Sequence, residues 1–209
     1  MHKLICAISV SLAGIASADE VTIAALGDSL THGYGLIEDQ GFVPQLQRWL
    51  DAKGAGVTLI NAGVSGDTTA GGLSRVGWTL SPEVDAMIVA LGGNDLLRGI
   101  APEVSRANID GILQAAKAAE VEVLLVGMEA PGNFGPEYKA QFDALYPELA
   151  DQYDAVFLES FFAGLPSRDP ALVAEWMQAD RIHPNAAGVA KIVEAFGPKV
   201  LELTQRARE

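Results

Sequence analysis

The stretch VTIAALGDSL, residues 21–30, decides the fold class of this chain. Its first six residues, 21–26, form a short run rich in Val, Ile, Ala and Leu, which is typical of a strand buried on both faces of a parallel sheet. A glycine follows at once, so Asp28 and Ser29 fall at the carboxyl end of the predicted strand. The stretch therefore predicts a parallel sheet that carries polar groups at one edge.

Four further runs of the same kind follow along the chain, which makes five predicted strands. Between the runs, apolar residues recur three and four positions apart, as in residues 42–50 and 104–113, and this spacing predicts helices. The last helix is predicted to begin after Pro184. Alternating strands and helices predict a three-layer α/β/α domain with helices on both faces of the sheet. The four further strands, each expected to be buried on both faces, are residues 57–60, 85–91, 121–128 and 155–158.

The composition is that of a globular protein and restricts its partners. The chain has 209 residues, 49% of them hydrophobic and 20% charged, which suits one domain with a sizeable core. Its 14 Lys and Arg residues against 27 Asp and Glu residues give a net charge of -13. That charge disfavours binding to a nucleic acid or to an anionic membrane surface, because both partners would be repelled. We expect a small-molecule partner and a monomer.

The first 18 residues have the composition of a secretory signal peptide. A short basic start precedes an apolar run, and residues 16–18 (Ala-Ser-Ala) supply a cleavage site. The run has about a dozen residues, fewer than the roughly 20 that span a bilayer, so we expect no permanent membrane anchor. Cleavage after Ala18 would remove the single cysteine, Cys6, and leave residues 19–209 as one domain. We therefore expect a periplasmic or secreted protein.

Polar residues follow several of the predicted strands, where the carboxyl ends of parallel strands form a ligand crevice. Ser29 is the candidate nucleophile because a strand-end loop can expose its hydroxyl beside a base. His183 is the candidate base, and Asp180, three residues earlier, can hold the imidazole in one orientation within a single turn. Taken alone, the Asp180 to His183 spacing has an alternative interpretation, in which Asp180 caps the N-terminus of a helix.

An acyl-transfer reaction also needs hydrogen-bond donors for the oxyanion that forms during attack. Three donors are available from three strand ends: the Ser29 N–H, the Gly63 N–H and the side-chain amide of Asn94. Glycine at position 63 permits close approach of the backbone. These groups predict an oxyanion hole.

The residues named above resemble the conserved blocks of a known enzyme family. Residues 27–30 (Gly-Asp-Ser-Leu), Gly63, residues 93–95 (Gly-Asn-Asp) and the pair Asp180 and His183 are similar, in order and spacing, to the four blocks of the SGNH, or GDSL, hydrolases. Residues 61–69, 176–178 and 183–185 look most like those of bacterial periplasmic arylesterases and multifunctional thioesterase/lysophospholipases.

The resemblance carries several expectations. It implies a flavodoxin-like sheet, a triad of Ser29, Asp180 and His183, no metal or cofactor, and hydrolysis of acyl esters, thioesters and lysophospholipids. It also implies that residues 96–101 form one lip of the acyl groove, and His32 departs from the small residue expected beside Ser29. We therefore expect four apolar residues to contact the substrate: Leu96, Leu97, Ile100 and Pro131.

Other functions fit the same sheet less well. A flavin-binding protein would place phosphate beside Asp28 without a nearby lysine, and a metal-dependent hydrolase would need clustered ligands such as His-x-x-x-His, which do not occur. A carbohydrate acetylesterase of the same fold and a non-catalytic periplasmic lipid-binding protein remain as alternatives. The apolar residues around the predicted crevice favour an acyl guest over a sugar.

Overall fold

The computed structural model describes residues 20–167 and 171–209 and contains a five-stranded parallel sheet. The strand order is β2-β1-β3-β4-β5, which is the flavodoxin-like order predicted from the resemblance. Every neighbouring pair is parallel, as the run of strands alternating with helices predicts. The strands are β1 (Val21–Gly27), β2 (Val57–Gly63), β3 (Ala86–Ala90), β4 (Glu122–Val126) and β5 (Val156–Leu158).

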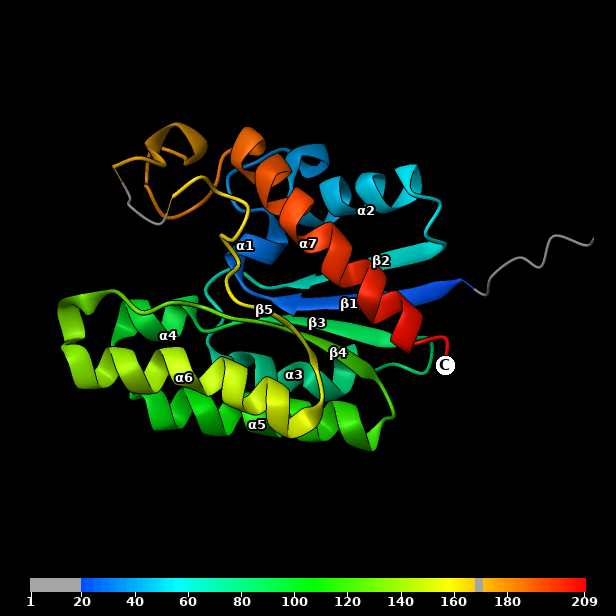
Figure 1. Cartoon of the computed structure of the whole chain (residues 1–209), viewed down its shortest axis with the longest axis horizontal. Coiled ribbons are helices and arrows are strands. Elements are labelled where there is room, and N and C mark those ends of the chain that lie inside the picture. Colours follow the sequence, from blue (N-terminus) through cyan, green and yellow to red (C-terminus); the bar gives the residue numbers. More distant parts are fainter. Residues whose placement is uncertain (1–19, 168–170) are drawn as a thin grey trace, which may run out of the picture.

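Helices cover both faces of the sheet and complete the three layers (Figure 1). The short helix α1 (Ser29–His32), α2 (Phe42–Ala52) and α7 (Ala186–Arg206) lie on one side. The helices on the other side are α3 (Thr69–Thr79), α4 (Gly93–Arg98), α5 (Pro102–Ala118) and α6 (Pro136–Tyr153). The loops that the structure describes contain three single 3₁₀ turns: η1 (Glu38–Gln40), η2 (Gly132–Phe134) and η3 (Ala174–Trp176).

Each face of the sheet has its own hydrophobic core, because alternate side chains of a strand point to opposite faces. In β1, Ile23 and Ala25 pack on the α2 and α7 side, whereas Ala24 and Leu26 pack on the α5 and α6 side. All five residues of β3 are buried. The central strands are therefore covered on both sides, as their uniformly apolar sequences predict.

The second strand is the exception, and its predicted burial on both faces is wrong. In β2, Val57 is buried, but Thr58, Ile60 and Asn61 are exposed. The physical reason is that only one face of this edge strand is packed: Leu59 joins Val57 in the core on the α2 and α7 side, whereas Thr58 and Ile60 point to the opposite face, which is open to solvent. The strand also continues to Gly63, three residues beyond the predicted end, in register with β1 up to Gly27.

The order of the strands creates a crevice at the carboxyl edge of the sheet. The chain moves from β1 outward to β2 and then returns to place β3 on the other side of β1. At such a switch point the loops after the two inner strands separate toward opposite faces and leave room for a ligand. Gly27 pairs with Gly63 on one side and with Ala90 on the other, so the three loops that follow start close together.

The predicted signal peptide, residues 1–18, lies outside the described residues. Within the part of the chain that is described, no helix is both long enough and apolar enough to cross a membrane.

The packing of α7 against the sheet can be tested at Phe196. Its ring is fully buried and lies edge-on to Phe42 and Phe161, with ring centroids 4.8 and 5.2 Å away. We expect Phe196→Ala to lower the free energy of unfolding by about 3–5 kcal/mol, because the change leaves a cavity in the core. Urea unfolding measures the difference. Val104→Ala, at an exposed position of α5, should change it by less than about 0.5 kcal/mol, and equal effects of the two variants would contradict this packing.

Candidate active site

The nucleophile predicted from the sequence lies where β1 turns into a helix. Ser29 is the first residue of α1, so its backbone N–H has no acceptor within the helix. Asp28 precedes it as the N-cap, and its Oδ1 accepts a hydrogen bond of 3.0 Å from the Leu30 N–H. The cap fixes the turn that exposes the Ser29 side chain at the end of a buried strand.

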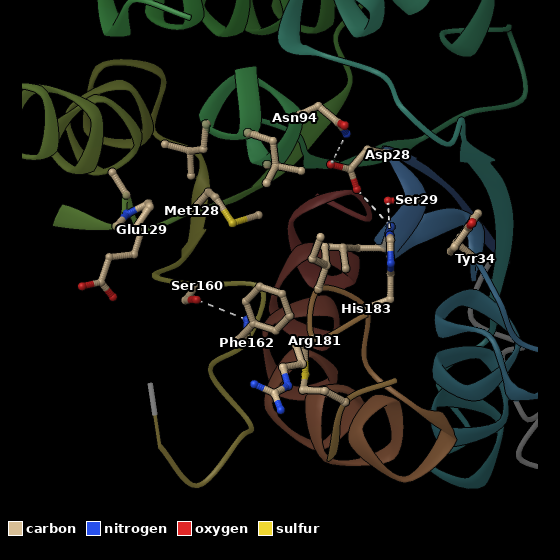
Figure 2. Close-up of a pocket in the computed structure, with 18 of the residues that line it drawn as sticks. Asp28, Ser29, Tyr34, Asn94, Met128, Glu129, Ser160, Phe162, Arg181 and His183 are labelled. Carbon is tan, nitrogen blue, oxygen red and sulfur yellow. Dashed lines mark hydrogen bonds between the residues drawn. The ribbon is translucent and has the colours of Figure 1, made fainter. Parts of the chain in front are cut away.

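The structure brings Ser29, His183 and Asp180 together in one chain of hydrogen bonds, and Figure 2 shows the part of it that joins His183 to Ser29. The distance from His183 Nε2 to Ser29 Oγ is 2.8 Å, and that from His183 Nδ1 to Asp180 Oδ2 is 2.7 Å. The other carboxylate oxygen, Asp180 Oδ1, accepts the backbone N–H groups of Ile182 and His183. The hydrogen bond from His183, followed by that from the Ile182 N–H, lowers the pKa of Asp180 to about 2.

Asp180 and His183 lie in a tight loop and not on a helix. The Gln178 N–H donates to the His183 carbonyl at 2.8 Å, and an antiparallel bridge joins Met177 to Pro184. Helix α7 begins only at Ala186, and Asn185 is its N-cap. The alternative interpretation of Asp180 as a helix cap is therefore wrong, whereas the predicted start of the last helix after Pro184 is confirmed.

Tyr34 contributes a second constraint on the imidazole that the sequence pattern did not reveal. Its ring centroid lies 4.6 Å from that of His183. The Gln178 side chain ties the two segments together, since its Nε2 donates to the Tyr34 carbonyl at 2.8 Å and to the Pro184 carbonyl at 3.0 Å. His183 is thus held by a carboxylate along one edge and by an aromatic ring on one side.

Two of the three predicted oxyanion donors face the pocket, and the third is engaged elsewhere. Ser29 and Asn94 both line the pocket. The Asn94 amide donates one hydrogen to Asp28 Oδ2 at 3.3 Å, which leaves its second N–H for another acceptor. The Gly63 N–H instead donates to Asn61 Oδ1 at 3.0 Å, because Asn61 folds back over the end of β2.

The glycine at position 63 permits a close approach of two backbone segments. A Cβ there would collide with the backbone of His32, at the end of α1. Glycine is therefore required so that α1 can pack against the end of β2. His32 itself is exposed, and its Nδ1 lies 3.0 Å from Ser65 Oγ, so it forms a second histidine and serine pair beside the first.

Asp28 is a site residue whose importance the sequence reasoning missed. Its side chain is 2% exposed, and burial raises its pKa from 3.8 to about 6, against the hydrogen bonds from Leu30 and Asn94 that lower it. It lines the pocket beside Ser29 and holds the Asn94 amide. Asp28 is part of the Gly-Asp-Ser-Leu motif, but its surroundings include Gly93 and Asn94, more than 60 residues away along the chain, which no local pattern encodes.

Arg75 of α3 is another residue that the sequence pattern did not identify, and it binds backbone carbonyls at the ends of β1 and β2. Its Nη1 and Nη2 donate to the carbonyls of Ala62 and Gly27 at 2.7 and 2.9 Å, while its Nε donates to Asp67 at 2.6 Å. A planar guanidinium can bind several acceptors at fixed angles, as a lysine cannot. The fork fixes the last residues of β1 and β2 just before the loops that carry Ser29 and Ser65.

A pocket of about 830 Å³ adjoins the Ser29 hydroxyl. Among the residues expected to contact substrate, Leu96, Leu97 and Pro131 line it. Ile100 is not among the lining residues, and its carbonyl accepts a hydrogen bond of 2.8 Å from the Tyr138 hydroxyl. The wall is mostly apolar away from Ser29, and its further apolar members include Met128, Phe134, Phe162, Leu165, Val173 and Met177.

Among the described residues, no group of three or more His, Cys, Asp or Glu side chains is arranged to hold a metal ion.

Comparison with known proteins identifies relatives along most of the chain. The GDSL-like lipase/acylhydrolase family matches residues 25–191. Esterase TesA of Pseudomonas aeruginosa is 38% identical over 183 residues, covering 87% of this chain and 89% of that protein. The protein named thioesterase 1/protease 1/lysophospholipase L1 of Escherichia coli is 37% identical over 165 residues, covering 78% and 76%. The crystal structure of AlinE4, an SGNH-hydrolase family esterase, superposes with a TM-score of 0.72 at 41% identity, covering 88% and 96%.

The buried carboxyl of Asp28 makes stability depend on pH. Because its pKa rises from 3.8 to about 6 on folding, its contribution to stability is complete below pH 3.8 and is lost as the pH rises through about 6. Asp28→Asn does not titrate and keeps an oxygen for the Leu30 N–H. We expect this variant to gain about 1.4 kcal/mol relative to wild type when urea unfolding is repeated at pH 7.5 instead of pH 5. A difference that does not change with pH would contradict the raised pKa.

Proposed function

This chain belongs to the GDSL-like lipase/acylhydrolase family, and we propose that it hydrolyses acyl esters and thioesters through a Ser29, His183 and Asp180 triad. One observation carries the proposal: an unbroken series of hydrogen bonds joins Asp180, His183 and Ser29 at 2.7 and 2.8 Å beside an apolar pocket. A serine hydroxyl is a weak nucleophile until a base accepts its proton, and the imidazole needs a partner that sets its tautomer. This arrangement supplies both.

The first half of the reaction forms an acyl-enzyme. Ser29 Oγ attacks the carbonyl carbon of the substrate while His183 Nε2 takes the hydroxyl proton, and the Asp180 carboxylate stabilises the resulting imidazolium. The tetrahedral intermediate then collapses. The bond to the leaving oxygen or sulfur breaks, and that atom receives the proton from His183 Nε2.

The second half returns the enzyme to its starting state. A water molecule attacks the acyl group on Ser29 and gives its proton to His183 Nε2. When the second intermediate collapses, the ester bond to Ser29 breaks and Oγ recovers the proton. The products are the free acid and the alcohol or thiol, and each half-reaction leaves proton and charge balanced.

Developing charge on the carbonyl oxygen is stabilised by the Ser29 N–H and by the free N–H of the Asn94 amide. Each such donor typically contributes about 3 kcal/mol of transition-state stabilisation in a water-poor site. Asp28 acts as a positioning residue here, because it holds the other Asn94 hydrogen and so aims the amide. The Gly63 N–H joins the oxyanion hole only when it leaves Asn61 Oδ1 or is shared with it.

The pocket favours substrates whose acyl group is longer than acetyl. Its wall combines Leu97, Met128, Phe134 and Phe162, which offer apolar surface and few polar partners. A sugar would need several converging hydrogen-bond groups, which is why the carbohydrate acetylesterase alternative is the weaker one.

We further propose that the chain is exported by residues 1–18, that residues 19–209 form one domain, and that the enzyme is a monomer without a cofactor.

The assignment of the nucleophile is tested by Ser29→Ala. With the attacking oxygen removed, we expect kcat toward p-nitrophenyl esters to fall by about four orders of magnitude or more, with the fold unchanged by circular dichroism. Asp180→Asn should cost about a hundredfold to ten-thousandfold, since the imidazole loses the partner that sets its tautomer.

The matched control is Ser65→Ala, which removes the other hydroxyl paired with a histidine in the same pocket. We expect it to lose less than about tenfold, because nucleophile and base remain. A larger loss in Ser65→Ala than in Ser29→Ala would overturn the assignment.

Chain-length preference distinguishes the substrate classes. Across p-nitrophenyl esters from acetyl to palmitoyl, we expect kcat/KM to rise from the acetyl ester to a maximum at intermediate length, because each buried methylene contributes about 0.8 kcal/mol until the pocket is full. Activity confined to the acetyl ester would favour the carbohydrate acetylesterase, and no activity on any ester would favour the lipid-binding protein.

A further inference from the structure

Arg181 lies between the two triad residues Asp180 and His183 in a backbone conformation that disfavours it. Its φ is +59°, in the left-handed region that glycine adopts most readily. The loop requires this geometry: Arg181 N–H donates to the Gln178 carbonyl at 3.0 Å, and Gln178 N–H then donates to the His183 carbonyl. In hairpins, a residue that follows such a turn in the left-handed conformation is typically glycine.

Among the described residues, the other two non-glycine residues with positive φ have an ordinary explanation. Glu120 and Asp154 directly follow or cap the C-terminal ends of α5 and α6, where a left-handed residue is a common way to end a helix. Arg181 caps no helix. The backbone of Arg181 is therefore strained next to the reacting groups, and helix capping does not explain why this position carries an arginine instead of a glycine.

The side chain is placed where a substrate can reach it. Arg181 lines the same pocket as Ser29 and His183, and Figure 2 shows its guanidinium pointing away from the Ser29 hydroxyl. Within the described part of the chain, it is the only lysine or arginine of the lining, and its guanidinium has no hydrogen-bond or ion-pair partner. The exposed lining carboxylate, Glu129, is instead paired with Lys139 at 3.1 Å.

The position of Arg181 relative to His183 indicates which part of the substrate it meets. The leaving oxygen or sulfur must come within hydrogen-bond distance of His183 Nε2 to receive its proton, so the leaving group lies against the loop that carries His183. Arg181 belongs to that loop, two residues earlier. The acyl chain has the apolar wall of Leu97, Met128 and Phe134 available to it.

From these observations we infer that Arg181 selects substrates whose leaving group carries a phosphate, by binding that phosphate with its guanidinium. A guanidinium offers paired N–H donors that match phosphate oxygens. A local cation is needed for such substrates because the chain has a net charge of -13, which repels anions from the protein as a whole. This inference rests on the proposed function and assigns a specificity-determining residue to the same site.

Two matched pairs of substrates test the inference on the exported enzyme, residues 19–209. The lipid pair is lauroyl glycerol phosphate against lauroyl glycerol, and the thioester pair is lauroyl-coenzyme A against lauroyl-pantetheine. Members of a pair share the acyl chain and the scissile bond; the lipid pair differs in one phosphate, and the thioester pair differs in the phosphates and the adenosine of coenzyme A. The readout is the ratio of kcat/KM for the phosphorylated member to that for the neutral one, measured below the concentration at which each lipid forms micelles.

We expect Arg181→Gln to lower this ratio by about tenfold or more, which is the range for a lost hydrogen bond to a charged group. Arg181→Lys should give a ratio between those of wild type and Arg181→Gln, because lysine keeps the positive charge but lacks the paired N–H donors of the guanidinium. In wild type the ratio should fall with added salt, and in Arg181→Gln it should not, since screening acts on the charge. A fall in the lipid pair alone identifies a phospholipid headgroup as the source, and a fall in the thioester pair alone identifies coenzyme A.

Two further variants separate the guanidinium from loop geometry and net charge. Glycine suits the left-handed backbone, so Arg181→Gly should be folded and at least as stable as wild type. Its ratio of kcat/KM values should nevertheless fall as far as that of Arg181→Gln, because the guanidinium is gone. Arg106→Gln removes one positive charge from α5, where Arg106 forms an ion pair with Glu148 of α6, and it should leave the ratio unchanged. The inference is overturned if Arg181→Gln keeps the wild-type ratio in both pairs, or if Arg106→Gln lowers it equally. Failure of wild type to hydrolyse any of the four substrates, by contrast, would overturn the proposed function itself.

Discussion

The whole site depends on the carboxyl ends of β1 and β3 lying side by side at the centre of the sheet. Gly27 and Ala90 are paired, so the loop that carries Ser29 and the loop that carries Asn94 begin as neighbours. Asp28 and Asn94 then meet in a hydrogen bond of 3.3 Å across the gap. Because the chain diverges to opposite faces at this point, the pocket opens between the loops without any break in the core beneath them. The parallel sheet therefore sets the relative positions of the loops that carry Ser29 and Asn94.

Around this point, charged groups are distributed so that each performs a separate task. Arg75 holds the carbonyls of Gly27 at the end of β1 and of Ala62 near the end of β2, and it forms an ion pair with Asp67. Asp28 is buried, with a raised pKa, and holds the Asn94 amide. Asp180 is more exposed, with a lowered pKa, and stays ionised beside His183. Two carboxyl groups near one serine thus differ in protonation behaviour because one is desolvated and the other is hydrogen-bonded.

Sequence alone predicts the order of strands and helices because the central strands are uniformly apolar and the helices are amphipathic. It fails at β2, where an edge position exposes residues such as Ile60 that composition treats as buried. It also identifies which polar side chains the structure brings together, since residues after parallel strands share an edge. It does not show that Asn61 occupies the Gly63 N–H, that Arg75 reaches two strand ends, or that the backbone of Arg181 is left-handed, because these depend on contacts between segments distant in sequence or on local dihedral angles.

The most direct measurement of the central claim, that Ser29 is the activated nucleophile, is covalent labelling with diethyl p-nitrophenyl phosphate followed by mass spectrometry of the intact protein and its peptides. This reagent phosphorylates a serine only when a base activates it. The account predicts one diethylphosphoryl group per chain, located on Ser29, with labelling that is lost in His183→Ala. Labelling on another residue such as Ser65, or labelling of Ser29 that persists without His183, would contradict it.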